Sequence, residues 1–239
     1  MAPNAEPSAK VLECSSVDFF YPGTRKPVLK ALSLDLREPG LHALFGPSGV
    51  GKTSLARLLS GQFRPAAGTI RSVGFESVLY SYNMERLPGW SAVGRHLERV
   101  TPANKTAQKD ELVKIFGLGG LLGQRFAQLS LGQQNRVNLI RYLVQAFDLL
   151  IMDESLANVD EKTRGRILLA IKDLFPHAFF IYISHNVVEV ARFCRDIWVL
   201  RGLHKTPQAA VVKGLDYRSR DSVDHRAHQR IMLEIMNAA

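Results

Sequence analysis

The sequence predicts an α/β protein with a parallel β-sheet that carries a phosphate-binding loop. Residues 46–54 read GPSGVGKTS and match the pattern GxxxxGK[ST] at every constrained position. An apolar run at 41–45 precedes this loop and a helical pattern follows it over 53–62, which gives the order strand, loop, helix. Farther along the chain, short apolar runs alternate with helical patterns, as in a parallel sheet covered by helices. The runs are 149–152, 179–183 and 196–200, and the helices are 161–174 and 186–194.

The N-terminal part of the chain is expected to form an antiparallel β subdomain. Residues 1–10 are polar and are expected to fray, whereas residues 11–21 mix β-branched and aromatic side chains as a strand does. A Pro-Gly turn follows, and residues 29–36 alternate apolar and polar side chains, which is typical of a half-exposed strand. Short strand-like pieces recur over 69–82.

The glycine-rich loop is predicted to hold the phosphates of a nucleotide. Its glycines let backbone N–H groups approach phosphate oxygens that a side chain would block. Lys52 is expected to reach the β- and γ-phosphates, Thr53 to offer its hydroxyl to Mg²⁺, and the helix that begins here to add its positive end. The alternative interpretation is a glycine-rich turn that fits the pattern by chance.

The composition becomes more helical between about 86 and 125. The clearest helical patterns are 90–99 and 107–116, separated by Thr101-Pro102, and a glycine-rich stretch follows at 117–123. This part of the chain is predicted to be an inserted helical subdomain.

Two adjacent carboxylates, Asp153 and Glu154, end the apolar run at 149–152. A carboxylate at the end of a buried strand beside a phosphate loop can hold Mg²⁺, a role that fits Asp153. Glu154 is then placed to orient the water that attacks the γ-phosphate, or to accept its proton. By themselves these residues could equally be exposed acids at the end of a strand.

Ser130 opens a helix whose apolar positions predict a buried face. The plain interpretation is an N-cap, because serine is a favoured capping residue. A helix N-terminus with serine and glycine is also an anion site, and this one precedes the acidic strand end by some twenty residues.

Together these motifs resemble those of the ATP-binding subunits of ABC transporters over nearly the whole chain. Leu129 to Gln133, which read LSLGQ, occupy the place of the family signature LSGGQ between the two Walker motifs. The resemblance implies a P-loop NTPase (RecA-like) core with an antiparallel β subdomain and an inserted α-helical subdomain. It further implies one ATP-binding domain over 1–239, with its core at about 1–83 and 140–239 and its helical subdomain at about 84–139.

The resemblance assigns a role to each matching residue. Glu154 falls on the catalytic glutamate, and His185 falls on the switch histidine that contacts the γ-phosphate. Lys52 is the third catalytic residue, and the D-loop falls at 157–160. Tyr21, or its neighbour Phe20, matches the aromatic residue that stacks on adenine, and Tyr21 fits better. The nucleotide-binding residues are Tyr21, Gly46, Pro47, Ser48, Gly49, Val50, Gly51, Lys52, Thr53, Ser54, Ser130, Gly132 and Gln133.

Two positions depart from the family pattern. Leu131 replaces the first signature glycine, so a side chain stands where backbone normally comes close to phosphate, and hydrolysis is expected to be slowed. The glutamine that follows a strand near 78–82 in the family is absent, and Asn83 is the nearest amide. Asn83 therefore joins Thr53 and Asp153 as an expected metal ligand, although its side chain is one methylene shorter than glutamine.

Composition limits the class of protein further. Apolar residues make up 46% of the 239 residues and charged residues 22%, which is ordinary for a globular protein. No apolar run approaches the length of a membrane helix, and residues 1–10 lack a secretory signal pattern, so we expect a protein on the cytoplasmic side. The two cysteines are expected to be packed thiols. The charge of +9 favours anionic partners.

The resemblance implies ATP and Mg²⁺ as cofactors and three kinds of partner. These are a second ATP-binding cassette with a homodimer expected, transmembrane permease subunits, and a solute-binding protein. The scattered basic residues form no dense block, so nucleic acid is not expected. The segment around Trp90 and the helix expected at 226–235 favour the nitrate, sulfonate and taurine importers, although both segments could be structural. The alternative function is a regulatory or degenerate cassette with little hydrolysis of its own.

Overall fold

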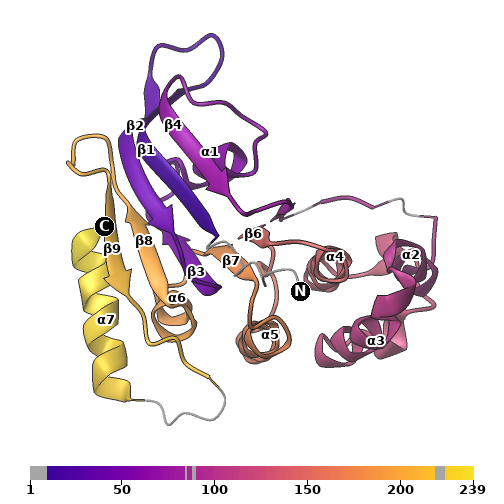
Figure 1. Ribbon diagram of the computed structural model, residues 1–239. Helices are drawn as coiled ribbons and strands as arrows, with labels where there is room; N and C mark the ends of the chain where they lie inside the picture. Colours follow the sequence, from indigo (N-terminus) through magenta and orange to yellow (C-terminus); the bar gives the residue numbers. More distant parts are fainter. Residues whose placement is uncertain (1–9, 84, 88–89, 219–223) are drawn as a thin grey trace, which may run out of the picture.

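A computed structural model describes residues 10–83, 85–87, 90–218 and 224–239 of the chain. It contains a three-stranded sheet with the order β2-β1-β4 and a six-stranded sheet with the order β5-β6-β7-β3-β8-β9 (Figure 1). The predicted α/β class is confirmed. Residues 1–9, which we expected to fray, lie outside the described residues.

The helices and strands agree closely with the sequence patterns. The strands are β1 Val11–Phe20, β2 Pro27–Leu36, β3 Gly40–Phe45, β4 Ala67–Val73, β5 Val78–Tyr82, β6 Leu149–Asp153, β7 Phe179–Ile183, β8 Asp196–Leu200 and β9 Ala209–Lys213. The α-helices are α1 Lys52–Leu59, α2 Val93–Val100, α3 Thr106–Ile115, α4 Leu131–Leu143, α5 Glu161–Leu174, α6 Val187–Phe193 and α7 His225–Ala238. Short 3₁₀ turns occur at Ala103–Lys105, Gly119–Leu121 and Phe126–Gln128.

The small sheet is antiparallel, as the N-terminal pattern predicts. Strand β1 lies in its centre and pairs with β2 on one side and β4 on the other. Its inward side chains, together with Leu55 and Leu58 of α1, share one buried cluster with the large sheet. Helix α1 is thus held between the two sheets, and the loop that precedes it is fixed on both sides.

Alternate residues of the large sheet enter two different cores, because successive side chains of a strand point to opposite faces. In β6, Leu149 and Ile151 pack with α1 and the small sheet. Leu150 and Met152 of the same strand pack with the helices on the other face. This arrangement explains why these strands read as continuous apolar runs rather than as alternating patterns.

The five strands from β5 to β8 run parallel, so their carboxyl ends meet at one edge of the sheet. Strand β3 leads into the glycine loop, β6 into Glu154, β7 into His185 and β5 into Asn83. The expected catalytic, nucleotide-binding and metal-binding residues of four separate sequence segments therefore converge at this edge, as ligand sites do in such folds.

The strand β9 was not predicted. It pairs antiparallel with β8, from Asp196 opposite Lys213 to Leu200 opposite Ala209, so the sheet ends in one antiparallel edge strand. Its five residues include the exposed side chain of Val211. Helix α7, expected at 226–235, lies beside β9 and carries the yellow C-terminal end in Figure 1.

The segment between β5 and α4 is helical, as expected. Helices α2 and α3 lie beside α4 at the side of the molecule away from α7 (Figure 1). The expected subdomain boundary at 139/140 falls inside α4, and residue 84 lies outside the described residues. The division of the chain into a core and a helical subdomain stays a prediction.

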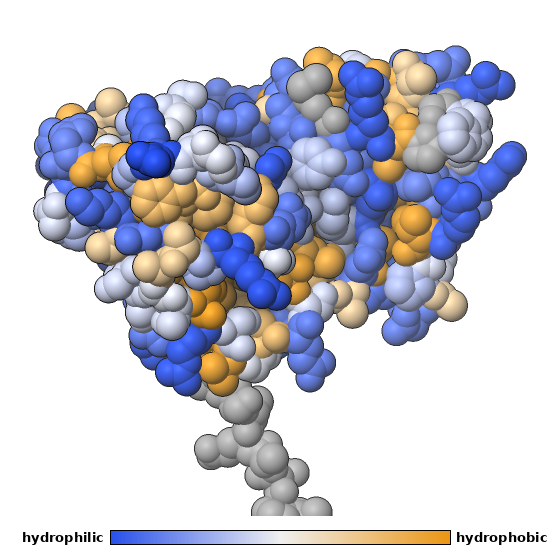
Figure 2. Space-filling view, turned by 90° about the horizontal axis from the view of Figure 1, so that it is seen from above, coloured by the Kyte–Doolittle hydropathy of each residue, from blue (hydrophilic) through white to orange (hydrophobic). Residues whose placement is uncertain are grey.

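The surface and the cysteines fit the composition. On the face seen from above, hydrophilic and hydrophobic residues are interspersed (Figure 2). Cys14 and Cys194 are buried free thiols, and burial raises the pKa of Cys14 to about 12. Across the part of the chain that the structure describes, no helix combines the length and the apolar character needed to cross a bilayer.

Candidate nucleotide-binding site

The glycine loop adopts a conformation that other residues rarely tolerate. Gly46 has φ 148° and Gly51 has φ 109°. A Cβ atom at Gly46 would lie 2.3 Å from the carbonyl oxygen of Leu200, so the loop passes directly over the end of β8. Gly51 precedes α1, whose N-terminus has no side-chain cap and no acidic residue in its first turn. The backbone N–H groups in the first turn of α1 therefore offer an anion site.

Lys52 folds back over the loop. Its Nζ atom donates hydrogen bonds of 2.8 Å to the carbonyl oxygens of Gly46 and Pro47. Burial lowers the pKa of this amine, while the carboxylates of Glu154 and Asp153 act in the opposite direction. A buried ammonium held only by carbonyl oxygens is suited to exchange them for the more negative oxygens of a phosphate.

A cleft of about 310 Å³ opens beside the loop and gathers most of the predicted site. Besides Val28, it is lined by Tyr21, Ser48, Gly49, Gly51, Lys52, Thr53, Ser54, Glu154 and His185. Val50 lines a neighbouring cleft of about 420 Å³ together with Tyr21 and Gly49. Gly46 and Pro47 contribute through the carbonyl groups that hold Lys52.

Tyr21 lies at the junction of these two clefts. Its hydroxyl group is 2.8 Å from Oγ of Ser54, and its ring packs edge-on against Phe19 and Phe63. Tyr21 as a whole is 36% exposed, so part of the residue remains open to a ligand. Stacking of Tyr21 on adenine stays a prediction.

Glu154 and His185 meet at the mouth of the cleft. Nε2 of His185 lies 2.8 Å from Oε1 of Glu154, and both side chains are partly exposed. The backbone of Glu154 is in the left-handed region at φ 52°, and its N–H donates to the carbonyl oxygen of Ile183. A non-glycine residue in this region stores strain, which is common at functional sites.

Asp153 is buried behind the cleft. Its Oδ2 atom accepts a 2.8 Å hydrogen bond from the hydroxyl of Tyr80, which leaves the second oxygen uncommitted by that bond. Burial, followed by the contact with Asp153, raises the pKa of Tyr80 above its ordinary range, so the hydroxyl stays a donor. The sequence did not identify Tyr80, because its partner lies 73 residues away along the chain.

A magnesium ion fits the donors of this site. Thr53 is exposed and lines the cleft, and the carboxylate of Asp153 is close enough to Lys52 for its charge to act on that amine. Both side chains are hard oxygen donors. Among the residues with described positions, no group of three or more His, Cys, Asp or Glu could hold a metal. A cation here would therefore depend on phosphate oxygens as well, as Mg²⁺ usually does.

Asn83 has a different partner from the one we expected. Its Oδ1 atom accepts a 2.9 Å hydrogen bond from the side chain of Asn135 on α4. The same amide group of Asn135 donates to the carbonyl oxygen of Ala157 at 2.7 Å. The role of Asn83 as a metal ligand stays a prediction, and the oxygen keeps a second lone pair beside this bond. Asn135 is a second residue that sequence reasoning missed.

The signature segment does not line the cleft beside the glycine loop of its own chain. Ser130 caps α4, since its Oγ accepts from the N–H of Gln133 and Gln133 Oε1 accepts from the N–H of Ser130. Ser130, Gly132 and Gln133 are not among the residues that line the cleft of the glycine loop. Leu131 is 49% exposed beside them. This segment therefore does not complete the site within one chain.

Residues 29–157 match the family model described as ABC transporter. This match covers more than half of the chain and includes the glycine loop, the signature segment and Glu154. The chain belongs to the ABC transporter family.

Curated relatives of this ABC cassette include ATP-binding proteins of several import systems. The molybdenum import ATP-binding protein ModC of Mesorhizobium japonicum is 34% identical over 74% of this chain and 54% of its own length. The taurine import ATP-binding protein TauB of Pseudomonas aeruginosa is 30% identical over 85% of this chain and 81% of its own. The chain spans about half the length of the molybdenum import relatives that it matches.

Solved structures confirm the fold of the ABC cassette. A bacterial Atm1-family ABC exporter with ATP bound matches all of this chain and 43% of its own, with a TM-score of 0.75 and 23% identity. A putative metal-chelate type ABC transporter in an inward-facing conformation matches 85% of this chain with a TM-score of 0.69. At these identities the comparison concerns the P-loop NTPase fold alone.

Proposed function

We propose that this chain is the ATP-hydrolysing subunit of an ABC-type membrane transporter. The observation that carries the proposal is the Glu154–His185 pair, which lies at the mouth of the same cleft as Lys52 and Thr53. A nucleotide seated on the glycine loop would present its γ-phosphate to these two side chains. The reaction is the transfer of the γ-phosphoryl group of ATP to water, which yields ADP and phosphate.

Each side chain has a distinct part in this reaction. Lys52 binds the β- and γ-phosphate oxygens and stabilises the charge that develops on them. Glu154 orients the attacking water and accepts its proton, and His185 contacts the γ-phosphate and holds Glu154 in place. Thr53 and Asp153 would hold Mg²⁺, with Asn83 as a further candidate. When bound, the ion neutralises phosphate charge and aligns the oxygens.

We further propose that two copies of the chain close head to tail over two nucleotides. The support is the exposure of Ser130 and Leu131 and their separation from the cleft of their own chain. In this arrangement the N-terminus of α4 in one copy covers the phosphates held by the other copy. Hydrolysis then reopens the pair, and the helical segment between β5 and α4 passes the motion to transmembrane permease subunits.

The transporter is proposed to be a solute importer of the nitrate, sulfonate or taurine type. The support is the taurine import relative, which matches along most of both chains. Relatives named for molybdenum and nickel import show that the solute is not fixed by this comparison. The assembly would include a solute-binding protein, with this subunit on the cytoplasmic side of the cell membrane.

A second candidate function is a regulatory cassette that binds nucleotide and hydrolyses little of it. The observations that favour it are the exposed Leu131 in the signature and the engagement of Asn83 by Asn135. The retained Lys52, Asp153, Glu154 and His185 favour the hydrolysing subunit instead.

The deciding experiment measures Mg-ATP hydrolysis and ATP binding by the purified wild type and by Glu154→Gln. We expect the wild type to hydrolyse ATP and the variant to bind ATP with similar affinity while hydrolysis falls at least about a hundredfold. Nucleotide binding without hydrolysis above background in the wild type, alone and with its permease, would leave the regulatory cassette as the better account.

A further inference from the structure

A buried polar cluster lies directly beneath the loop that carries His185. Its centre is Glu189 on α6, which is only 4% exposed. The carboxylate of Glu189 accepts hydrogen bonds of 3.0 Å from the hydroxyl of Tyr182 and from the side-chain amide of Asn186. It also forms a 2.5 Å ion pair with Nε of Arg164 on α5. No part of the proposed hydrolysis uses this carboxylate directly.

The cluster fixes the backbone on both sides of His185. The N–H of Asn186 donates to Oγ of Ser184, so the two neighbours of the histidine are tied to each other. Oδ1 of Asn186 accepts from the N–H of Glu189, and the amide of Asn186 donates back to the carboxylate. This reciprocal pair caps α6. The residue that follows His185 is therefore bound to Glu189 through both its side-chain oxygen and its side-chain nitrogen.

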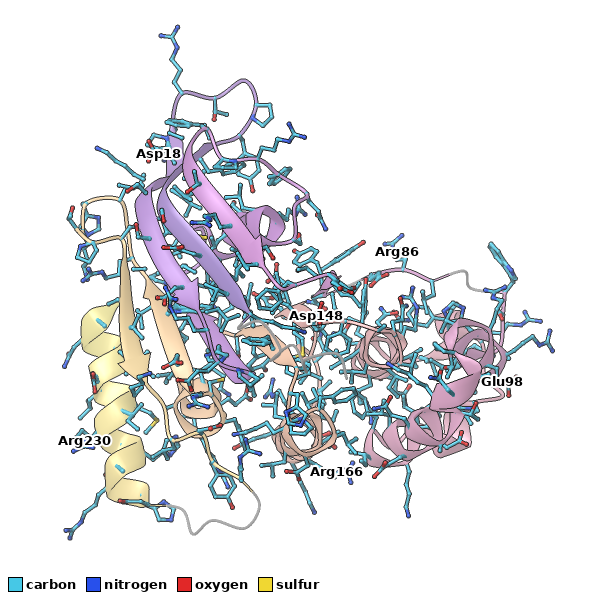
Figure 3. All side chains as sticks on the ribbon, in the orientation of Figure 1. Asp18, Arg86, Glu98, Asp148, Arg166 and Arg230 are labelled. Carbon is cyan, nitrogen blue, oxygen red and sulfur yellow. The ribbon has the colours of Figure 1, made fainter. Side chains whose placement is uncertain are left out.

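The ion pair with Arg164 connects Glu189 to a second loop, the one between Glu154 and α5. Arg164 lies in the first turn of α5, which Asp160 caps at the end of the loop that follows Glu154. Arg166, labelled in Figure 3, marks this helix on the ribbon. The two loops face each other across a cleft of about 600 Å³ lined by Glu154, Asn158, Arg164 and His185. The ion pair thus joins α5 to α6 beneath that cleft.

Stability alone does not explain a charge pair at this place. The carboxylate of Glu189 is buried and loses its hydration, whereas the side chain of Arg164 keeps 19% of its surface exposed. Apolar side chains of similar size often stabilise a fold as well as or better than a buried charge with its partner. A carboxylate held at once by the hydroxyl of Tyr182, the amide of Asn186 and the charge of Arg164 is, however, restricted to few arrangements. The pair is suited to hold the loop of His185 in one position.

We propose that Glu189, through its ion pair with Arg164, is a positioning residue for His185 in hydrolysis. Neither side chain touches the nucleotide. Removal of the negative charge on Glu189 would free Arg164 and loosen the cap of α6, so that His185 no longer meets Glu154 at hydrogen-bonding distance. This inference rests on the proposed ATPase function.

A second ion pair, on the helix α5 that also carries Arg164, provides a matched control. Lys172 of α5 is also buried and forms a 2.5 Å ion pair with Asp216. Its Nζ atom donates to the carbonyl oxygens of Phe193 and Tyr217, so this pair fastens the far end of α6 and the segment after β9. Asp216→Asn removes the charge of a carboxylate that is paired with the buried Lys172 of α5. It leaves unchanged the cap of α6, which Asn186 forms next to His185.

The test compares Glu189→Gln with Asp216→Asn in three measurements. These are kcat and KM for ATP, the midpoint of thermal unfolding, and the ring resonances of His185 in spectra of histidine-labelled protein. His185→Ala identifies the resonance among the seven histidines. We expect Glu189→Gln to lower kcat about tenfold or more with little change in KM and to shift the His185 signal. Asp216→Asn should change only the unfolding midpoint.

The outcomes separate this inference from the proposed function. Equal losses of stability in both variants, with kcat and the His185 resonance unchanged in Glu189→Gln, would show that the cluster is only structural. A wild type without hydrolysis would overturn the proposed function instead. The resonance of His185 would still report, in that case, whether Glu189 sets its position.

Discussion

His185 and Glu154, at the ends of β7 and β6, lie within hydrogen-bonding distance, 2.8 Å apart from Nε2 to Oε1. Because each side chain positions the other, their substitutions should not be additive. We expect His185→Ala and Glu154→Gln each to lower kcat strongly and the double variant to be little slower than the slower single variant. Steady-state kinetics of the four proteins measures this. Independent, multiplicative losses would mean that the pair does not act as a unit.

Tyr80→Phe should weaken the response to magnesium. The phenol donates a 2.8 Å hydrogen bond to the buried carboxylate of Asp153, and phenylalanine keeps the ring but not the donor. An outer partner of a metal ligand commonly contributes tenfold or more to metal affinity, so the Mg²⁺ concentration for half-maximal hydrolysis should rise about tenfold. Titration with Mg²⁺ at saturating ATP tests this. An unchanged midpoint would contradict a role of Asp153 in holding the ion.

Gly132→Ala should disturb the contact between α4 and the loop that follows Glu154. A Cβ atom at Gly132 would lie 2.1 Å from the carbonyl oxygen of Asn158, so backbone must move. We expect a loss of about 1 to 3 kcal/mol in unfolding free energy and a large fall in hydrolysis. Gly120→Ala is the control, because a Cβ atom there meets nothing within 4 Å. Equal stability of the two variants would refute the close contact.

Leu131→Gly and Leu131→Ala should both raise kcat several-fold. The side chain of Leu131 is 49% exposed at the first position of α4, where the partner cassette is proposed to approach with its phosphates. Glycine also weakens a helix by about 1 kcal/mol, so the alanine variant separates the removal of bulk from the loss of stability. Hydrolysis assays of both variants decide the matter. Unchanged rates would show that Leu131 does not limit closure.

Asp196→Asn should lower stability at neutral pH and lower it less as the pH falls below 4. Nδ1 of His42 lies 3.2 Å from Oδ2 of Asp196. The contact with His42 and, as a smaller cause, the contact with Lys213 hold the pKa of this carboxyl below its ordinary value of 3.8. A carboxyl whose pKa is lower in the folded than in the unfolded protein stabilises the fold at pH values above its unfolded-state pKa. This stabilisation is lost as the pH falls through the folded-state pKa. We expect a difference of about 2 kcal/mol at pH 7 that shrinks below pH 4.

Urea unfolding of wild type and Asp196→Asn across this range measures the difference. Asp110→Asn serves as the control, since the carboxylate of Asp110 is exposed, pairs only with its neighbour Lys109 among the described ion pairs, and should contribute little at any pH. A constant difference between wild type and Asp196→Asn down to pH 3 would show that ionisation of Asp196 is not the cause.

Elements with strong local signals were predictable from the sequence. Helix α5 begins and ends where its pattern places it, because Asp160 caps it and its apolar residues repeat at helical spacing. The strand β9 carries only five residues, and its pairing with β8 depends on the turn between them rather than on its own pattern. A single-sequence pattern therefore gave no sign of it.

The same distinction applies to the site. The glycine loop, Glu154 and His185 were accessible because each belongs to a short motif with a fixed order. Tyr80 and Asn135 act across 73 and 52 residues of sequence, so only the folded arrangement shows their partners. The hydrogen bond between Asn83 and Asn135 was likewise not predicted, and the role of Asn83 as a metal ligand stays a prediction. Glu189 had a weak signal, because Asn186-x-x-Glu189 fits a capping box.

The helices between β5 and α4 share a single buried cluster with the large sheet. Leu97 of α2 and Leu112 of α3 belong to the same cluster as Leu150 and Met152 of β6. Melting of either helix would expose apolar surface of the neighbours that support the sheet. The helical segment and the sheet are therefore expected to unfold cooperatively. Any rotation of the helices during the proposed transport cycle is restricted to motions that keep this shared hydrophobic core closed to water.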